Sequence, residues 1–129
     1  MLYRSFGTGK VIWSALPLEN ETMYDYRNTL LRLIDTKFAP DYTVSAAAPK
    51  TVEVVSFRTK NAILVSCVHL FEDDYAETFP GFEIRVRCNQ PTSVQLLPEE
   101  TQVKYTYENG QVVFRTRDLH LFDMYRIVW

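Results

Sequence analysis

Two kinds of hydrophobic periodicity divide the chain near residue 40. Between residues 22 and 38, apolar side chains recur at intervals of three and four, for example at Leu30, Leu33 and Ile34, which is typical of an amphipathic helix. The run GKVIWSA before it, at residues 9–15, predicts a short strand. From residue 42 onward the helical period disappears, and short runs rich in β-branched and aromatic residues take its place.

These short runs predict an antiparallel β-sandwich. In the run 82–88, apolar residues alternate with Glu83, Arg85 and Arg87, which indicates a strand with one wet and one dry face. The run 62–70 is apolar on both faces and is expected at the centre of a sheet. Asn109-Gly110 is a strong hairpin signal, because both residues tolerate positive φ in a type I′ turn. The predicted strands are 51–57, 62–70, 82–88, 93–97, 102–107, 111–116 and 124–129.

The predicted fold class is therefore mostly β: an Ig-like antiparallel sandwich of about seven strands. We expect two regions: a strand–helix element at residues 1–40, interpreted as the remnant of an α/β domain, and the sandwich at residues 41–129. Thr22 is the expected N-cap of the helix. The strand is expected to join a sheet of the sandwich or of a second copy. The helix is expected to cover an apolar sheet face, and a homodimer is favoured over a monomer.

Composition narrows the function classes. The 129 residues include 14 basic and 16 acidic ones, for a net charge of −2, which argues against a nucleic-acid partner because no basic excess exists to neutralise phosphates. No apolar run of 18 residues occurs, so we expect no membrane span. The absence of a signal-peptide pattern near the N-terminus favours a cytoplasmic location.

Cysteines and histidines could in principle carry metal or redox chemistry. Cys67 and Cys88 are interpreted as reduced, buried thiols in adjacent central strands. The alternative is a disulfide between neighbouring strands, which needs an oxidising compartment. His69 lies two residues from Cys67 and His120 is distant in sequence, but no CxxC or HxxxH spacing occurs. We therefore expect no metal site and no cofactor.

Acidic residues gather in one polar segment, 71–81, and at Glu99 and Glu100. A glycosidase needs two carboxyl groups on rigid walls that face each other across a cleft. Acids in a polar loop are instead solvated and ionised, and the alternative of calcium binding lacks the D-x-[DN]-x-[DN]-G spacing. We expect no catalytic residue among them. The acids of the loop are Glu72, Asp73, Asp74 and Glu77.

Aromatic residues make up 14% of the chain. Most lie on apolar phases and are expected in the core. Tyr75 and Phe79 in the acidic loop, and Tyr105 and Tyr107 beside the predicted hairpin, are the candidates for carbohydrate contact, because sugar rings stack on exposed aromatic faces. The alternative for Tyr105 and Tyr107 is packing across strands.

Several strings resemble parts of multidomain glycoside hydrolases. GTGKVIWSALPLE followed by YRNTLLRLI resembles the last strand and helix of a glutamine-amidotransferase-like domain, as in β-galactosidases that carry a trimerisation domain after their barrel. LVSCVHLFEDDY, PGFEIRVRC, SVQLLPE and YENGQVVFRTRDLHLFDMYRIVW resemble the small antiparallel domain that closes those enzymes. The resemblance covers nearly the whole chain, but its motifs are structural and imply no substrate.

The resemblance implies a C-terminal accessory region without catalytic activity of its own. Glycoside hydrolases of that type need a (β/α)₈ barrel of about 250 residues, which this chain is too short to hold. The implied role is packing against the catalytic domain of its parent chain, with a part in oligomerisation. Two alternatives stay open: a stand-alone carbohydrate-binding module, and a protein-interaction domain with no sugar role.

Overall fold

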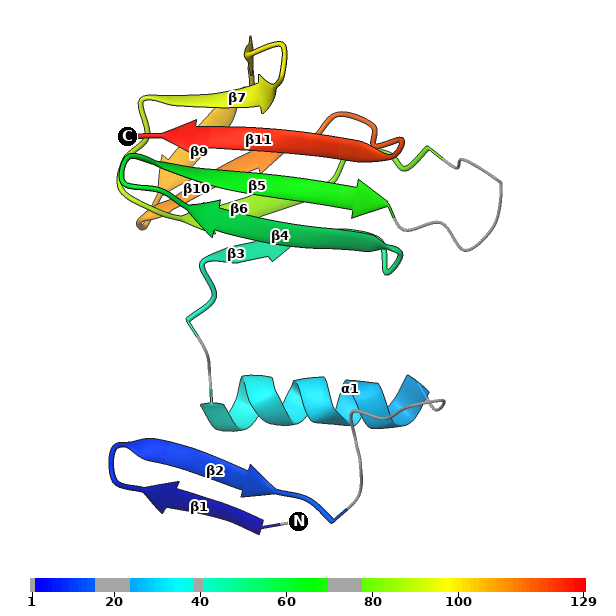
Figure 1. The fold of residues 1–129 in the computed structure, drawn as a ribbon, viewed down its shortest axis with the longest axis vertical. Coiled ribbons are helices and arrows are strands. Elements are labelled where there is room, and N and C mark those ends of the chain that lie inside the picture. The colour runs from blue at the N-terminus through cyan, green and yellow to red at the C-terminus, as the bar shows by residue number, and fades with distance from the viewer. Residues whose placement is uncertain (1, 16–23, 39–40, 70–77) are drawn as a thin grey trace. The chain divides into compact units, whose positions relative to one another are not determined.

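The computed structural model of the chain describes residues 2–15, 24–38, 41–69 and 78–129. These residues fall into two compact units, Met1–Asp41 and Tyr42–Trp129. The first unit holds a two-stranded hairpin and a helix, and the second holds two antiparallel sheets (Figure 1).

The strand predicted near the N-terminus is one half of a hairpin. Strand β1 (Leu2–Phe6) pairs antiparallel with β2 (Gly9–Trp13), and Gly7 turns the chain between them at a φ of 59°. The expected pairing of β2 with a sheet of the sandwich was therefore wrong, and pairing with a second copy stays a prediction. The residue pattern does not predict β1, because LYRSF contains polar residues at two of its five positions and carries no apolar run.

Helix α1 (Tyr24–Leu33) continues into a π-helical segment, η1 (Ile34–Phe38). Together they span most of the predicted helix, whose expected cap, Thr22, lies outside the described residues. Within the described ranges, no helix combines the length and the hydropathy that a membrane crossing requires.

The end of this helix contacts the hairpin. The ammonium group of Lys10, on β2, donates a hydrogen bond to the main-chain oxygen of Lys37 at 3.1 Å. The ammonium group of Lys37 in turn lies 5.6 Å from the centre of the Tyr3 ring, within the range of a cation–π contact. Hairpin and helix are thus linked inside the first unit.

The second unit is an antiparallel β-sandwich, which confirms the predicted fold class. One sheet has the spatial order β3–β6–β10–β9, and the other has the order β4–β5–β11–β7–β8. The first sheet contains β3 (Val44–Ala46), β6 (Glu83–Arg87), β9 (Tyr105–Glu108) and β10 (Gln111–Arg115). The second contains β4 (Val52–Arg58), β5 (Ala62–His69), β7 (Ser93–Leu97), β8 (Thr101–Gln102) and β11 (Phe122–Val128).

The predicted strands are found with two corrections. The run 102–107 is not one strand, because the chain leaves the five-stranded sheet after β8 and enters the four-stranded sheet at β9. At this crossing the amide of Val103 still donates to the carbonyl of Val94 at 2.8 Å. Strand β3, only three residues long, is too short for its pattern to stand out. The Asn109-Gly110 hairpin is confirmed, with φ values of 52° and 76°.

The core lies between the two sheets. Alternate residues of each strand point inward, as β geometry requires: Ile63, Val65 and Cys67 on β5, and Tyr125 and Ile127 on β11, are all essentially inaccessible. The remaining buried apolar side chains are Val52, Phe82, Ile84, Val86, Val94, Leu96, Val112, Phe114 and Leu119.

Residues 78–82 and 116–120 continue the pairing of β6 with β10 beyond the ends of the two strands. The amide of Thr116 donates to the carbonyl of Phe82 at 2.9 Å, and Phe79 and Leu119 exchange two main-chain hydrogen bonds. Gly81 lies against Thr116 so closely that a Cβ atom there would lie 2.2 Å from the Thr116 carbonyl oxygen. Any larger residue at position 81 would push the two segments apart.

We therefore expect Gly81→Ala to lower the free energy of unfolding by about 3 kcal/mol, because backbone atoms cannot yield to the added methyl group. Urea titration followed by circular dichroism measures the loss. Gly110→Ala is the control: its Cβ would meet nothing within 4 Å, but φ is +76°, so its cost should stay near ~1 kcal/mol. Equal losses in the two variants would contradict the close-contact argument.

Candidate functional site

Two of the four aromatic candidates come from the acidic loop. Tyr75 lies outside the described residues, as do the loop acids Glu72, Asp73, Asp74 and Glu77. Phe79 is half-buried and packs against the core. Its ring meets that of His69 edge-on, with ring centres 4.5 Å apart.

The other two candidates, Tyr105 and Tyr107, lie on the same face of β9 and pack against the core. They lie opposite Phe114 and Val112 of β10. Each hydroxyl donates to a main-chain oxygen: Tyr105 to Pro91 at 3.2 Å, and Tyr107 to Cys88 at 3.0 Å. The structure thus places these tyrosines in cross-strand packing, and carbohydrate contact through the four aromatics stays a prediction.

The other acidic pair of the sequence analysis lies in the turn after β7. Both Glu99 and Glu100 are exposed. A carboxylate oxygen of Glu100 accepts a hydrogen bond from the Arg126 guanidinium at 2.7 Å, and Gln95 also binds this guanidinium. Glu100 is therefore part of a surface ion pair on the five-stranded sheet.

The two cysteines are free thiols that lie in different sheets. Cys67 is buried on β5, and Cys88 is half-buried directly after β6. The expectation of two buried thiols in adjacent strands was therefore wrong in its placement, because β5 and β6 face each other across the core. Burial, together with the charge of Asp123, raises the pKa of Cys67 to about 12. Burial also raises the pKa of Cys88, against the lowering effects of a hydrogen bond to the Val112 backbone and of the Arg58 charge.

The histidines lie apart from the thiol of Cys88 and have other contacts. His69 packs on Phe79, and the His120 ring lies within hydrogen-bond distance of the Thr78 hydroxyl, at 3.0 Å from Nδ1. Across the residues that the structure describes, no group of three or more His, Cys, Asp or Glu side chains could hold a metal ion.

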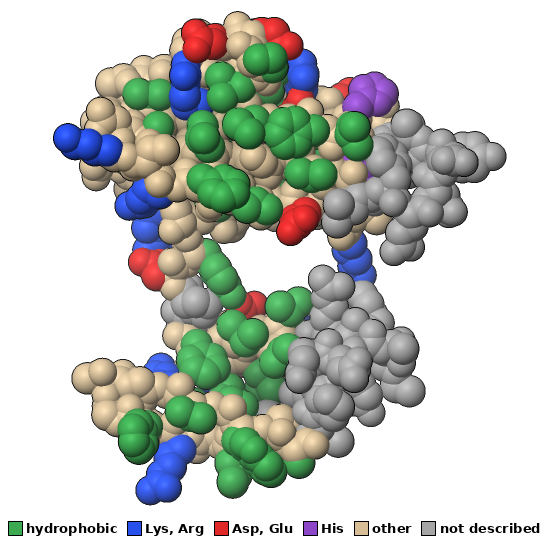
Figure 2. Space-filling model, in the orientation of Figure 1, with side chains coloured by type: hydrophobic (Ala, Val, Ile, Leu, Met, Phe, Trp, Pro, Cys, Tyr) green, Lys and Arg blue, Asp and Glu red, His purple; other side chains and the backbone are tan. Residues whose placement is uncertain are grey.

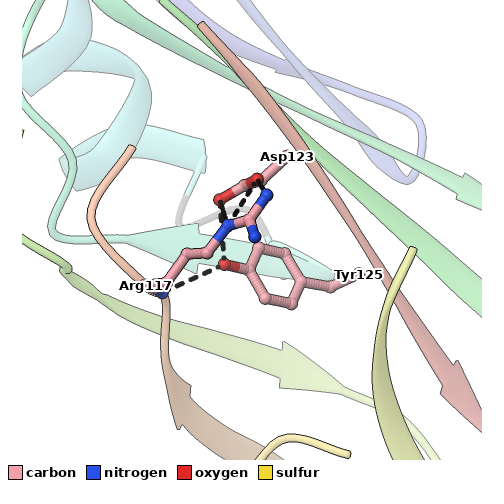
Figure 3. Close-up of polar contacts among 3 residues, drawn as sticks. All are labelled: Arg117, Asp123 and Tyr125. Carbon is pink, nitrogen blue, oxygen red and sulfur yellow. Dashed lines mark hydrogen bonds and ion pairs between the residues drawn. The ribbon is translucent and has the colours of Figure 1, made fainter. Parts of the chain in front are cut away.

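Among the described residues, the most buried acidic side chain is that of Asp123, on β11 (Figure 3). The Arg117 guanidinium donates to it twice, from Nη2 at 2.7 Å and from Nε at 3.0 Å. The Tyr125 hydroxyl lies 3.4 Å from the other carboxylate oxygen, and it accepts the main-chain N–H of Arg117 at 3.2 Å. This closed set of contacts is called the Asp123 cluster below.

The Asp123 cluster has a structural rather than a catalytic chemistry. A buried carboxylate is costly unless it is paired and hydrogen-bonded, and Arg117 and Tyr125 meet that requirement. Hydrogen bonding to Asp123 raises the pKa of Arg117, and burial raises the pKa of Tyr125, with the Asp123 charge as the second cause. Neither Arg117 nor Tyr125 is therefore poised to exchange a proton near neutral pH.

A cavity of about 440 Å³ lies at the end of the sandwich where β4, β6 and β11 finish. Both sheets contribute to its wall. The guanidinium of Arg58, at the end of β4, donates to the main-chain oxygen of Arg87 on β6 at 3.4 Å and so spans the gap between the sheets. The side chains that line the cavity are Arg58, Arg87, Cys88, Asn89, Tyr107 and Trp129. We call this space the sandwich-end cavity.

Sequence reasoning missed this cavity, apart from Tyr107 and Cys88. Arg58 stands in the polar stretch RTKN, which looks like an ordinary turn, and Trp129 follows an apolar run and looks like core. Only their positions could have indicated a shared site, because Arg58, Cys88 and Trp129 each come at or directly after the end of a predicted strand. Which strand ends meet depends on the sheet order, which the sequence does not give.

The sequence matches no protein-family model and no curated protein. Its fold matches a solved structure, alpha-L-fucosidase isoenzyme 2 from Paenibacillus thiaminolyticus, with a TM-score of 0.72 and 11% sequence identity. The match covers 81% of this chain and 18% of that one. The chain therefore shares its fold with a part, about one fifth, of a glycoside hydrolase.

We expect Arg117→Gln to lower the free energy of unfolding by about 3 kcal/mol, because it leaves the Asp123 carboxylate buried without its counter-charge. Asp123→Asn should cost less, about 1–2 kcal/mol, since Arg117 is 56% exposed and can be solvated when its partner is gone. Thermal and urea unfolding measure both. Arg85→Gln is the control: it breaks the exposed pair of Arg85 with Glu83 and should change the free energy of unfolding by less than ~0.5 kcal/mol. A larger loss in Asp123→Asn than in Arg117→Gln would contradict this explanation.

Alkaline pH should destabilise the protein through Cys67. The pKa of this thiol in the folded protein, about 12, lies above its ordinary value of 9.0. The thiol therefore loses its proton first in the unfolded chain, and stability is lost as pH rises from 9 toward 12. The loss should approach about 1.4 kcal/mol per pH unit for this one thiol. Urea unfolding at pH 8, 9 and 10 measures how steeply the free energy of unfolding falls with pH. Cys67→Ser should reduce this slope, and Cys88→Ser should change it much less. An unchanged slope in Cys67→Ser would overturn the prediction.

Proposed function

We propose that this chain is a non-catalytic accessory domain of a longer glycoside hydrolase and packs against the catalytic part of its parent. The observation that carries the proposal is the fold match, in which the chain corresponds to a minor part, 18%, of a glycoside hydrolase chain. A narrower form, that the parent is of β-galactosidase type, rests on the sequence resemblance alone.

The packing surface that we propose is the outer face of the five-stranded sheet. Since Asp123, Tyr125 and Ile127 of β11 point into the core, their neighbours Phe122 and Met124 point outward. Phe57 of β4 lies opposite Leu64 of β5, and Val68 of β5 lies opposite Phe122. The outer face also carries Glu53, Ser66, Gln95 and Arg126. Its apolar part, called the outer apolar face below, consists of Val55, Phe57, Leu64, Val68, Leu97, Phe122 and Met124.

Two aromatic side chains of the outer apolar face are strongly exposed. Phe57 is 57% exposed and Phe122 is 48% exposed, and Figure 2 shows hydrophobic side chains gathered over the sheet that faces the viewer in the second unit. Contiguous exposed apolar area of this kind marks an interaction surface. The occupant we propose is the parent's own catalytic part, because four fifths of the fold neighbour's chain lies beyond the region that this chain matches.

Catalysis by this chain alone is not part of the proposal. Hydrolysis of a glycoside needs two facing carboxyl groups, whereas the carboxylates of Asp123, Glu100 and Glu83 each pair with an arginine. The purified chain is therefore expected to show no turnover of nitrophenyl galactoside or nitrophenyl fucoside.

The docking test uses the coding sequence next to this chain. Sequencing the flanking DNA should reveal a barrel domain; expressed separately, that domain should bind this chain in analytical ultracentrifugation. Phe57→Asp and Phe122→Asp together should weaken the complex at least about 100-fold, because each places a charge in an apolar interface.

The control is Thr106→Asp, which places one aspartate at an exposed position of the opposite sheet. It should leave the affinity within about twofold. A flanking sequence with no hydrolase domain, or a double variant that binds as tightly as the unmodified chain, would contradict the proposal.

A further inference from the structure

The sandwich-end cavity combines a cationic group with aromatic and amide side chains. Its volume of about 440 Å³ lies within the range of small-molecule sites, about 300–1,000 Å³. Arg58 and Arg87 both line it, and none of the described side chains that line it is a carboxylate. The Arg58 guanidinium is the cationic group in this wall that can face an anionic ligand.

Arg58 has donors to spare for such a ligand. A guanidinium carries five N–H donors, and the hydrogen bond that anchors Arg58 to the Arg87 carbonyl uses Nη2 at a long 3.4 Å. Among the ion pairs of the described residues, none involves Arg58. Its charge reaches the cavity wall, since it acts on the thiol of Cys88. Such a planar fork matches a carboxylate in a bidentate geometry.

Trp129 adds a flat apolar surface to the cavity wall. Its amide is fixed by a 3.2 Å hydrogen bond to the Asn61 carbonyl, and its half-buried ring packs partly on the core while it lines the cavity. Tyr107 adds a second aromatic ring, held by its hydroxyl bond to Cys88. Asn89, which is exposed, can both donate to and accept from hydroxyl groups.

We propose that the sandwich-end cavity binds a hexuronic acid residue: Arg58 binds the carboxylate, Trp129 stacks against the pyranose ring and Asn89 binds ring hydroxyls. A simple carboxylate such as acetate has no ring to stack against Trp129, and a neutral hexose has no charge to pair with the Arg58 guanidinium. The site is independent of the proposed accessory role, because it lies at the end of the sandwich and not on the outer apolar face. Each can therefore fail without the other.

The test uses the only tryptophans of the chain, Trp13 and Trp129. Trp13→Phe removes an exposed ring of the hairpin and leaves Trp129 as the sole indole reporter. Titration of this chain with D-galacturonate should shift the Trp129 indole N–H signal in ¹H–¹⁵N spectra and give saturable binding. D-glucuronate tests a second uronate, D-galactose lacks the carboxylate and acetate lacks the ring. Each of these last two should bind at least about tenfold more weakly than the better uronate.

Arg58→Gln should weaken uronate binding at least about tenfold, with an unchanged melting temperature because Arg58 is exposed. If that variant loses its fold, Arg58→Lys keeps the charge but not the fork and should still weaken binding. Arg85→Gln is the matched control, since it removes the same charge from an exposed site on β6. Galactose or acetate binding as tightly as uronate, no binding of either uronate, or equal losses in the Arg58 and Arg85 variants would each overturn the proposal.

Discussion

The ion pair between Asp123 and Arg117 is the contact on which much of the sandwich depends. Asp123 lies on β11, in the middle of the five-stranded sheet, and is 4% exposed. Because a buried carboxylate costs several kcal/mol without a partner, the segment between β10 and β11 has to bring Arg117 to it. That same segment passes from one sheet to the other. The carboxylate of Asp123 in the five-stranded sheet thus constrains the path of the β10–β11 connection, which comes from the four-stranded sheet.

The neighbours of Arg117 extend this constraint. Thr116 accepts the amide of Phe82 with its hydroxyl oxygen, and Asp118 accepts the amide of Gly81, both at 2.9 Å. Three consecutive side chains, 116–118, therefore bind three different groups: two main-chain amides and the Asp123 carboxylate. The opposite end of the sandwich is different: there the Arg58 guanidinium makes one long hydrogen bond, at 3.4 Å, to the Arg87 carbonyl. Thr116, Arg117 and Asp118 thus bind defined partners at one end of the sandwich, whereas the Arg58 guanidinium keeps N–H donors for a ligand at the other end.

The sequence predicted the sandwich well because period-two alternation and a strong turn signal are local. The strands around Ile84, Val65 and Asn109-Gly110 needed no long-range information. It predicted the site poorly because sites form where distant strand ends meet, as Arg58 and Trp129 do. It also could not show that β8 and β9 belong to different sheets, since a crossing of two residues leaves no change in the pattern. The hairpin partner β1 escaped notice for a similar reason: its pairing with β2, not its composition, makes it a strand.

The position of β11 has a consequence for how the sandwich is made. β11 is the last of the sandwich strands in chain order, yet it lies between β5 and β7 and pairs with both. During synthesis, β4 and β5 can pair as soon as they emerge, but the inner edges of β5 and β7 wait until residues 122–128 leave the ribosome. Until then the growing chain exposes two unpaired strand edges, which are the surfaces most prone to wrong association. Completion of the sheet, and burial of Tyr125 and Ile127 with it, thus comes only after the last strand of the sandwich has been synthesised.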